Sequence, residues 1–172
     1  MIDYTKEENC PNWAKIQKII KHDDNNIIGM FLQYRYLSNF HICHIEYEGL
    51  KFTSTEAAYH SAKFNSTKLK QLLSTMGPME SLRESRKHKI DIPNWHSTFK
   101  FEVMYDVNWI KFNIPELKNM LLDTENKHIV EKNWWRDIVW GQDADGNGEN
   151  NLGKIIMKIR DNLKYNLDNI LE

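Results

Sequence analysis

The sequence predicts an α+β fold: a mostly helical single domain with a small antiparallel β-sheet. The chain has 172 residues, of which 41% are hydrophobic and 27% charged, an ordinary balance for one globular domain with a buried core. Apolar residues recur at helical spacing through most of the chain after residue 53, whereas strand-like patterns are short and lie before it. Many helices with few strands favour the α+β class.

Local patterns predict the order of the elements. We expect residues 1–26, which are polar, to form an N-terminal extension with one short amphipathic helix, and residues 27–172 to form the main domain. The expected elements are a helix through Trp13, Ile16, Ile19 and Ile20, a strand at 27–32, a structured loop at 34–40, a hairpin at 45–52 around a glycine turn, and helices from about residue 53, over 67–75, from Pro78, over 95–110, over 115–122 and over 152–163.

Charge and cysteine content narrow the function classes. There are 23 Lys and Arg residues against 24 Asp and Glu, so a basic face for non-specific nucleic-acid binding is not expected, although a local basic pocket remains open. Cys10 and Cys43 are isolated and lack metal-site spacing, which favours a reduced, cytoplasmic location, with a single disulfide as the alternative. The polar start is unlike a signal peptide, and no apolar run approaches the roughly 18 residues of a membrane span. We expect no membrane association.

The helix that opens near Thr53 carries three polar residues on one face. Glu56, His60 and Lys63 follow one another at spacings of four and three. Thr53 and Glu56 have the spacing of a capping box, and such a stripe is usually solvated. The same helix is otherwise largely apolar, which predicts a central position where polar groups need partners or a function. A carboxylate there suits general acid–base chemistry, and a lysine in an apolar site suits nucleophilic attack.

The loop at residues 143–148 resembles the start of an EF-hand calcium loop. Its twelfth position, counted from Asp143, is Lys154 where the pattern needs a carboxylate, so calcium is disfavoured. A glycine loop before a helix also suits anionic or polar ligand groups, and a plain turn capped by Asn150 or Asn151 is the alternative.

A basic segment and several tryptophans have two interpretations each. Arg83 and Arg86 are three residues apart on an expected helix, where they form either a solvated face or a phosphate contact. Trp95 follows a proline at a helix start, and Trp140 precedes the glycine loop. Either tryptophan can be a packing residue or stack on a planar base.

Five motifs in order resemble the NADAR family, also called YbiA-like, over residues 27–165. They are Leu37-Ser38-Asn39-Phe40, Thr55-Glu56-x-x-Tyr59-x-x-x-Lys63-Phe64, Asn94-Trp95, Asp137-x-x-Trp140-Gly141 and Gly146-x-Gly148-x-Asn150-x-Leu152-Gly153. Gly77-Pro78-Met79 with the two arginines also resembles a family segment. The resemblance implies a YbiA-like fold and an N-glycosidase that hydrolyses a ribosyl C–N bond, without a metal or cofactor.

The resemblance implies two substrate classes. One is an early riboflavin-pathway ribosylaminopyrimidine phosphate, a small phosphorylated nucleoside-like molecule. The other is ADP-ribose on the guanine amino group of nucleic acid. A non-catalytic sensor of NAD or ADP-ribose is the alternative, and no obligate protein partner is expected.

The resemblance also implies residue roles. Glu56 is the expected acid/base, Lys63 pairs with it or forms a Schiff base with the opened sugar, and Asp137 orients water or a ribose hydroxyl. The residues expected to bind substrate are Asn39, Phe40, Arg83, Arg86, Trp95, Trp140, Gly141 and Asn150. The chain departs from the family pattern Ser-Glu-His-Tyr-Phe-Gln, because Ala57 follows Glu56 and His60 replaces the glutamine.

Overall fold

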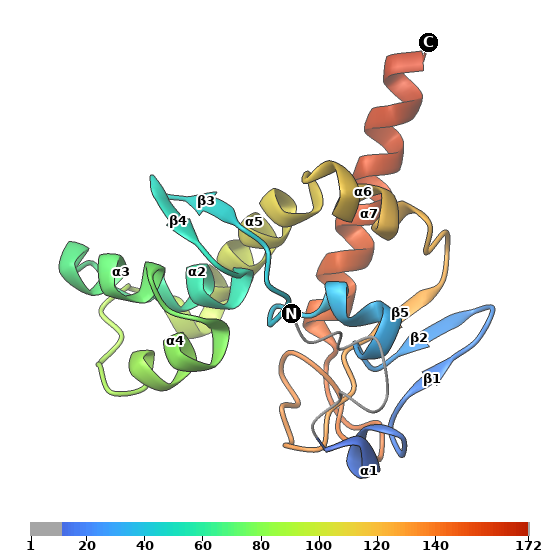
Figure 1. Ribbon diagram of the computed structural model, residues 1–172, viewed down its shortest axis with the longest axis horizontal. Helices are drawn as coiled ribbons and strands as arrows, with labels where there is room; N and C mark the ends of the chain where they lie inside the picture. Colours follow the sequence, from blue (N-terminus) through green and yellow to red (C-terminus); the bar gives the residue numbers. More distant parts are fainter. Residues whose placement is uncertain (1–11, 172) are drawn as a thin grey trace. The chain divides into compact units, whose positions relative to one another are not determined.

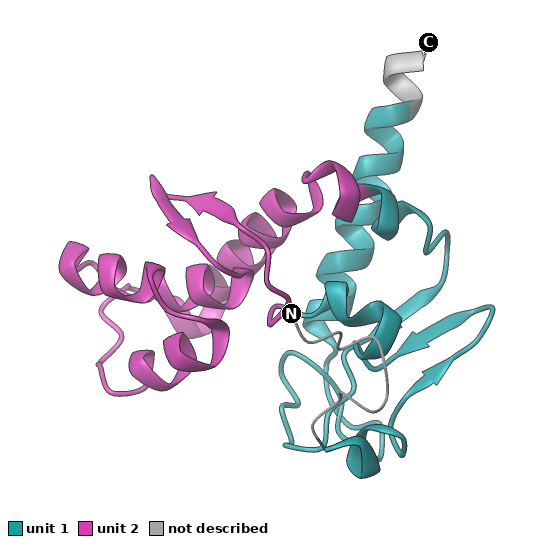
Figure 2. Ribbon diagram, in the orientation of Figure 1, with its two compact units in different colours: residues 1–38, 119–172 teal, residues 39–118 magenta. Residues whose placement is uncertain are grey.

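The computed structural model describes residues 12–171 and confirms the α+β class, with helices dominant and short strands (Figure 1). The chain divides into two compact units (Figure 2). Unit 1 comprises Met1–Ser38 and Asn119–Glu172, and unit 2 comprises Asn39–Lys118. Residues 1–11 of the expected N-terminal extension, including Cys10, lie outside the described residues. The boundary at residues 26 and 27 stays a prediction.

Unit 1 contains a mixed three-stranded sheet. Its strands are β1 (Lys21–His22), β2 (Asn26–Ile28) and β5 (His128–Val130), in the order β1-β2-β5. β1 and β2 are antiparallel, whereas β2 and β5 are parallel with Ile27 opposite Ile129. The strand expected at 27–32 ends at Ile28, because Gly29 has a φ of 84° and leaves the extended conformation. The β5 strand was not predicted.

Helices complete unit 1. They are α1 (Trp13–Ile16), the 3₁₀-helix η2 (Leu32–Leu37), α6 (Pro115–Leu122), which crosses the boundary of the units, and α7 (Asn151–Leu171). α7 packs on β5 and buries Ile156, Ile159 and Leu163. The first helix is shorter than expected, since α1 ends at Ile16 and the chain turns toward β1. The helices expected at 115–122 and 152–163 are confirmed, the second with a longer C-terminal part.

Unit 2 is built around a short central helix. Its elements are the hairpin β3 (Ile45–Tyr47) and β4 (Leu50–Phe52), the helices α2 (Thr55–Ser61), α3 (Thr67–Ser74) and α4 (Pro78–Ser85), the π-helical turn η3 (Trp95–Phe99), and α5 (Lys100–Phe112). Helix α2 contacts β4, α3, α4 and α5, and most of its residues are buried. Its predicted central position is therefore confirmed. The hairpin turns through Glu48 and Gly49, both with positive φ, as a two-residue turn requires.

The start of α2 differs from the capping-box prediction, which is wrong. Ser54 is the N-cap, and its hydroxyl accepts a hydrogen bond from the Ala57 N–H at 3.2 Å. Thr53 instead donates its hydroxyl to the Met76 carbonyl at 2.8 Å. The N-cap of the helix is therefore one residue later than expected, and the carboxylate of Glu56 is not needed as part of the cap.

We predict that Ser54→Ala destabilises the protein more than the same change at Ser66, the N-cap of α3. Both hydroxyls accept from a backbone N–H, but Ser54 is fully buried and Ser66 is exposed. Water replaces the lost acceptor only at Ser66. Urea unfolding should show a loss of about 1 to 2 kcal/mol for Ser54→Ala and about 0.5 kcal/mol for Ser66→Ala. Equal losses would contradict the assigned cap.

Candidate functional site

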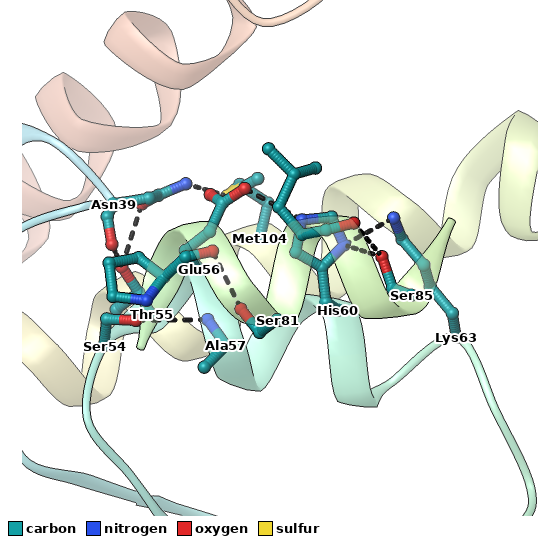
Figure 3. A network of polar contacts seen from close by, with 12 residues as sticks. Asn39, Ser54, Thr55, Glu56, Ala57, His60, Lys63, Ser81, Ser85 and Met104 are labelled. Atoms are coloured by element: carbon teal, nitrogen blue, oxygen red, sulfur yellow. Dashed lines mark hydrogen bonds and ion pairs between the residues drawn. The ribbon is translucent and has the colours of Figure 1, made fainter. Parts of the chain in front are cut away.

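Two side chains of α2 and one from the turn just after its last residue, Ser61, form a continuous chain of polar contacts (Figure 3). The His60 Nε2 lies 2.8 Å from Glu56 Oε1, and the Lys63 Nζ lies 2.7 Å from His60 Nδ1. Ser85 of α4 places its Oγ 3.1 Å from the same Nδ1. The polar stripe predicted from spacing is thus a connected network, and His60 stands at its centre.

This network is largely enclosed, with Glu56 and Lys63 partly exposed and His60 buried. The exposed fraction of the side chain is 4% for His60 and 13% for Glu56. The Lys63 Nζ lies 5.0 Å from the centre of the Tyr59 ring and 5.9 Å from that of Trp95. Both rings are themselves buried and lie 5.2 Å apart. The lysine is therefore held against aromatic faces and mostly away from bulk solvent.

Burial shifts the protonation of two members of this network. Burial lowers the pKa of Lys63 to about 8; Glu56 opposes that shift, and Arg86 adds to it. Burial also lowers the pKa of His60, against the hydrogen bond and charge of Glu56 and with the charges of Lys63 and Arg86. The imidazole is therefore neutral at pH 7.

The contacts fix the tautomer of this neutral imidazole. A charged lysine has only donors, so Lys63 donates to Nδ1 and that nitrogen accepts. The ring proton is then on Nε2, from which it is donated to the Glu56 carboxylate. One neutral ring thus joins an anion to a cation. The face offers a carboxylate for acid–base chemistry and an amine with a pKa near neutral pH.

Asn39 supports the start of α2 from inside unit 2. Its carbonyl accepts the Glu56 N–H at 3.2 Å, and its Oδ1 accepts from the Thr55 hydroxyl at 3.0 Å and from Asn108 Nδ2 at 3.1 Å. The residue is 5% exposed. The structure therefore shows Asn39 fixing the backbone that carries Glu56, while its predicted contact with substrate stays a prediction.

The other predicted residues of unit 2 differ in their relation to the network. Arg86, exposed at the end of α4, acts electrostatically on both His60 and Lys63. Arg83 is exposed one turn earlier on the same helix. Trp95 is 3% exposed and packs on Tyr59, so it forms a wall beside Lys63. Phe40 is half-buried. Their predicted substrate contacts remain predictions.

Four predicted residues lie in unit 1 and build the segment before α7. The Asp137 carboxylate accepts the backbone N–H groups of Val139 at 3.2 Å and Trp140 at 3.0 Å. The Gly141 carbonyl accepts the N–H of Asn150 at 3.2 Å. The Asn150 amide accepts the N–H of Glu131 at 3.0 Å and donates to the carbonyl of Ile129 at 2.9 Å. These contacts show structural roles, and functional roles for the four residues remain predictions.

The loop at residues 143–148 is a turn stabilised by hydrogen bonds to the side chain of Asp143. The Asp143 carboxylate accepts from the backbone N–H groups of Asp145 at 3.0 Å and Asn147 at 2.9 Å. Within residues 12–171 no group of three His, Cys, Asp or Glu side chains has the arrangement of a metal site. In the same part of the chain no helix has both the length and the apolar character to cross a membrane.

Sequence reasoning gave no role to two members of the network. His60 was singled out by its spacing, and its contacts with Glu56 and Lys63 now explain that spacing. Ser85 was not singled out, because its place beside His60 depends on the packing of α4 against α2. No local pattern reports such a contact between helices.

Comparisons with known proteins agree with this geometry. The family model of the NADAR domain matches residues 22–164. A riboflavin biosynthesis protein of Vibrio vulnificus is 32% identical over 140 residues, which are 77% of this chain and 37% of that protein. This chain thus spans little more than a third of the Vibrio protein. N-glycosidase YbiA of Escherichia coli (strain K12) is 28% identical over 152 residues, 87% of this chain and 94% of that protein.

A solved structure supports the same assignment. The NMR structure of E. coli YbiA superposes with a TM-score of 0.73 at 28% identity, and the match covers 91% of this chain and 95% of that chain. The family model spans most of the residues and includes every predicted site residue. The chain therefore belongs to the NADAR domain family.

Proposed function

We propose that the protein is an N-glycosidase that hydrolyses the C–N bond between ribose and a heterocycle in a phosphorylated substrate. The observation that carries the proposal is the chain of contacts from Glu56 through His60 to Lys63, with the lysine held against two buried aromatic rings. The resemblance of the chain to N-glycosidase YbiA over nearly the whole length of both proteins supports the reaction class.

Three steps follow from the chemistry of these groups. Glu56, when protonated, donates its proton to the leaving nitrogen, so that the base departs with the electrons of the C–N bond. The Lys63 amine supplies an electron pair to the anomeric carbon as the ring opens, which forms a Schiff base and places a proton on the ring oxygen. Water then adds to the same carbon, the amine leaves, and free ribose closes. The partial exposure of Glu56 to water supports a role for its carboxylate in this last step.

The substrate class rests on charge and on the relatives. Arg86 is exposed and acts electrostatically on the lysine end of the network, which supports a phosphate-bearing substrate. The riboflavin biosynthesis protein of V. vulnificus favours a ribosylaminopyrimidine phosphate. ADP-ribose on the amino group of guanine presents the same kind of bond, and we include it as the second substrate. Asp137 is proposed to orient water or a ribose hydroxyl.

One assay tests the function. The protein is incubated separately with a ribosylaminopyrimidine phosphate and with an oligonucleotide carrying ADP-ribosyl guanine, and the released base is measured by chromatography. Release from either substrate supports an N-glycosidase and selects its substrate. Tight binding of ADP-ribose without release of base from either compound would overturn hydrolysis in favour of a sensor.

We predict that Glu56→Gln removes turnover and preserves binding. The amide keeps the size of the side chain and a contact with His60, but it neither donates nor accepts a proton at working pH. Loss of one acid–base group lowers kcat by roughly a hundredfold to ten-thousandfold, while the substrate Kd from calorimetry should change by less than about threefold, on the order of 0.6 kcal/mol. Glu46→Gln, at an exposed carboxylate of β3, is the control and should keep full activity. Turnover by Glu56→Gln at the unaltered rate would contradict the assignment.

We predict that borohydride traps the sugar on Lys63 more readily as pH rises through 8. Because the pKa of Lys63 is lowered from 10.5 to about 8, about one in ten of these side chains is neutral at pH 7. For an unshifted lysine the neutral share at that pH is roughly one in three thousand. Mass spectrometry of the substrate-treated protein should locate the adduct on Lys63 and show its yield rising between pH 7 and pH 9.

Lys63→Arg should abolish this adduct, because the guanidinium stays protonated. Lys68→Arg, at an exposed lysine of α3, is the matched control and should leave the adduct unchanged. An active enzyme that yields no adduct at any pH would exclude the Schiff base and leave Lys63 as the partner of the acid–base group.

A further inference from the structure

The ring of His60 contacts both the carboxylate of Glu56 and the amine of Lys63. Nδ1 faces Lys63 at 2.7 Å and Nε2 faces Glu56 at 2.8 Å. The ring is 96% buried, since its exposed fraction is 4%. Protons that pass between the two groups inside unit 2 therefore have a path that avoids water.

We propose that His60 is a positioning residue that relays a proton from Lys63 to Glu56 and so prepares both groups for the reaction proposed above, on which this inference rests. Lys63 gives a proton to Nδ1, and the proton on Nε2 passes to the Glu56 carboxylate. The amine, the imidazole and the carboxyl group are then all neutral, and the number of protons is unchanged. One internal transfer yields both the nucleophile and the acid.

Ser85 makes both tautomers of the ring acceptable. Its hydroxyl lies 3.1 Å from Nδ1 (Figure 3). The same hydroxyl donates to the carbonyl of Leu82 at 3.0 Å. After the transfer Nδ1 carries a proton and donates to Ser85 Oγ, while the hydroxyl proton points to Leu82. Before the transfer the lone pair of Nδ1 accepts from Lys63, and the hydroxyl keeps its bond to Leu82. The buried ring thus keeps a partner in either state.

Arg86 and burial lower the cost of forming this neutral product, and the charge of Glu56 opposes it. Arg86 of α4 places a further positive charge near Lys63, and its effect on both His60 and Lys63 is to lower the pKa. Glu56 on α2 is the opposing anion. Tyr59 and Trp95 are the aromatic neighbours of the lysine and bring no formal charge. Loss of the proton from Lys63 therefore relieves repulsion with Arg86, and burial further favours neutral groups.

Chemical rescue tests the relay. His60→Ala should lower kcat by roughly a hundredfold, and imidazole added to the assay should restore it at least tenfold. Pyrazole is a ring of the same size with one N–H and one acceptor nitrogen, but it is far less basic and should not restore the rate. Equal rescue by both rings, or by neither, would overturn the relay. His88→Ala is the matched control at a partly exposed histidine and should be insensitive to both rings.

His60→Gln provides a variant that keeps the fold. Its amide can donate to Glu56 and accept from Lys63, so both contacts are retained while proton transfer through the side chain is lost. We expect a normal melting temperature with kcat lowered by roughly a hundredfold. A fully active His60→Gln protein would refute the relay, because position and hydrogen bonds would then suffice.

A second readout separates this inference from the proposed function. Ribose 5-phosphate with cyanoborohydride traps Lys63 without any cleavage of a C–N bond, and mass spectrometry gives the rate. The wild type should form the adduct faster than His60→Gln, and imidazole should accelerate His60→Ala. If no assay shows release of base but the adduct rates follow this order, the proposed hydrolysis is wrong and the relay is supported. If base is released normally and the adduct rates do not differ, only the proposed relay is wrong.

Discussion

The hydrogen bonds of a buried neutral imidazole connect an anion and a cation in unit 2, and the polar network from Glu56 to Lys63 is continuous only because of that ring. A direct ion pair between a buried lysine and a carboxylate would hold both groups in their charged forms, because each stabilises the other. His60 donates one hydrogen bond to Glu56 and accepts one from Lys63, so the two charges are separated by the width of the ring. Burial, which disfavours the charged amine, therefore has the largest effect on Lys63, and the pKa of this side chain falls to about 8.

The rest of unit 2 holds this ring in place. Helix α2 is short, but four other elements contact it, and Ser54 and Asn39 satisfy the first free N–H groups at its start. With Ser54 as the cap, the carboxylate of Glu56 points along the helix face toward His60. α4 then brings Ser85 to the far side of the same ring. Caps and helix packing, which serve stability, also fix the polar network.

The sequence predicted what is encoded locally and missed what depends on distant residues. Helical spacing predicted that Glu56 and His60 share a face of α2, although Lys63, expected on the same face, lies in the turn after the helix. The helix starts at Pro78 and Pro115 followed from the fixed φ of proline. The β5 strand has three residues and pairs with β2 about one hundred positions earlier, so no local pattern indicated it. The same limit applies to the structural contacts of Asn39 and Asn150, whose amides hydrogen-bond to groups distant in the sequence within their own units. Their predicted contacts with substrate remain predictions.

The contacts of His60 suggest a physical reason for a histidine at this position. The family pattern that the chain resembles has a glutamine there, and a glutamine can bridge a carboxylate and an ammonium with one donor and one acceptor. An amide does not act as an acid or a base at neutral pH, so in that pattern the carboxylate and the amine would exchange protons with other groups. His60 makes both contacts in this chain, and under the proposed relay its ring adds a path for the proton. Under that proposal, histidine at position 60 gives the acid and the amine a shared source of protons that glutamine would not.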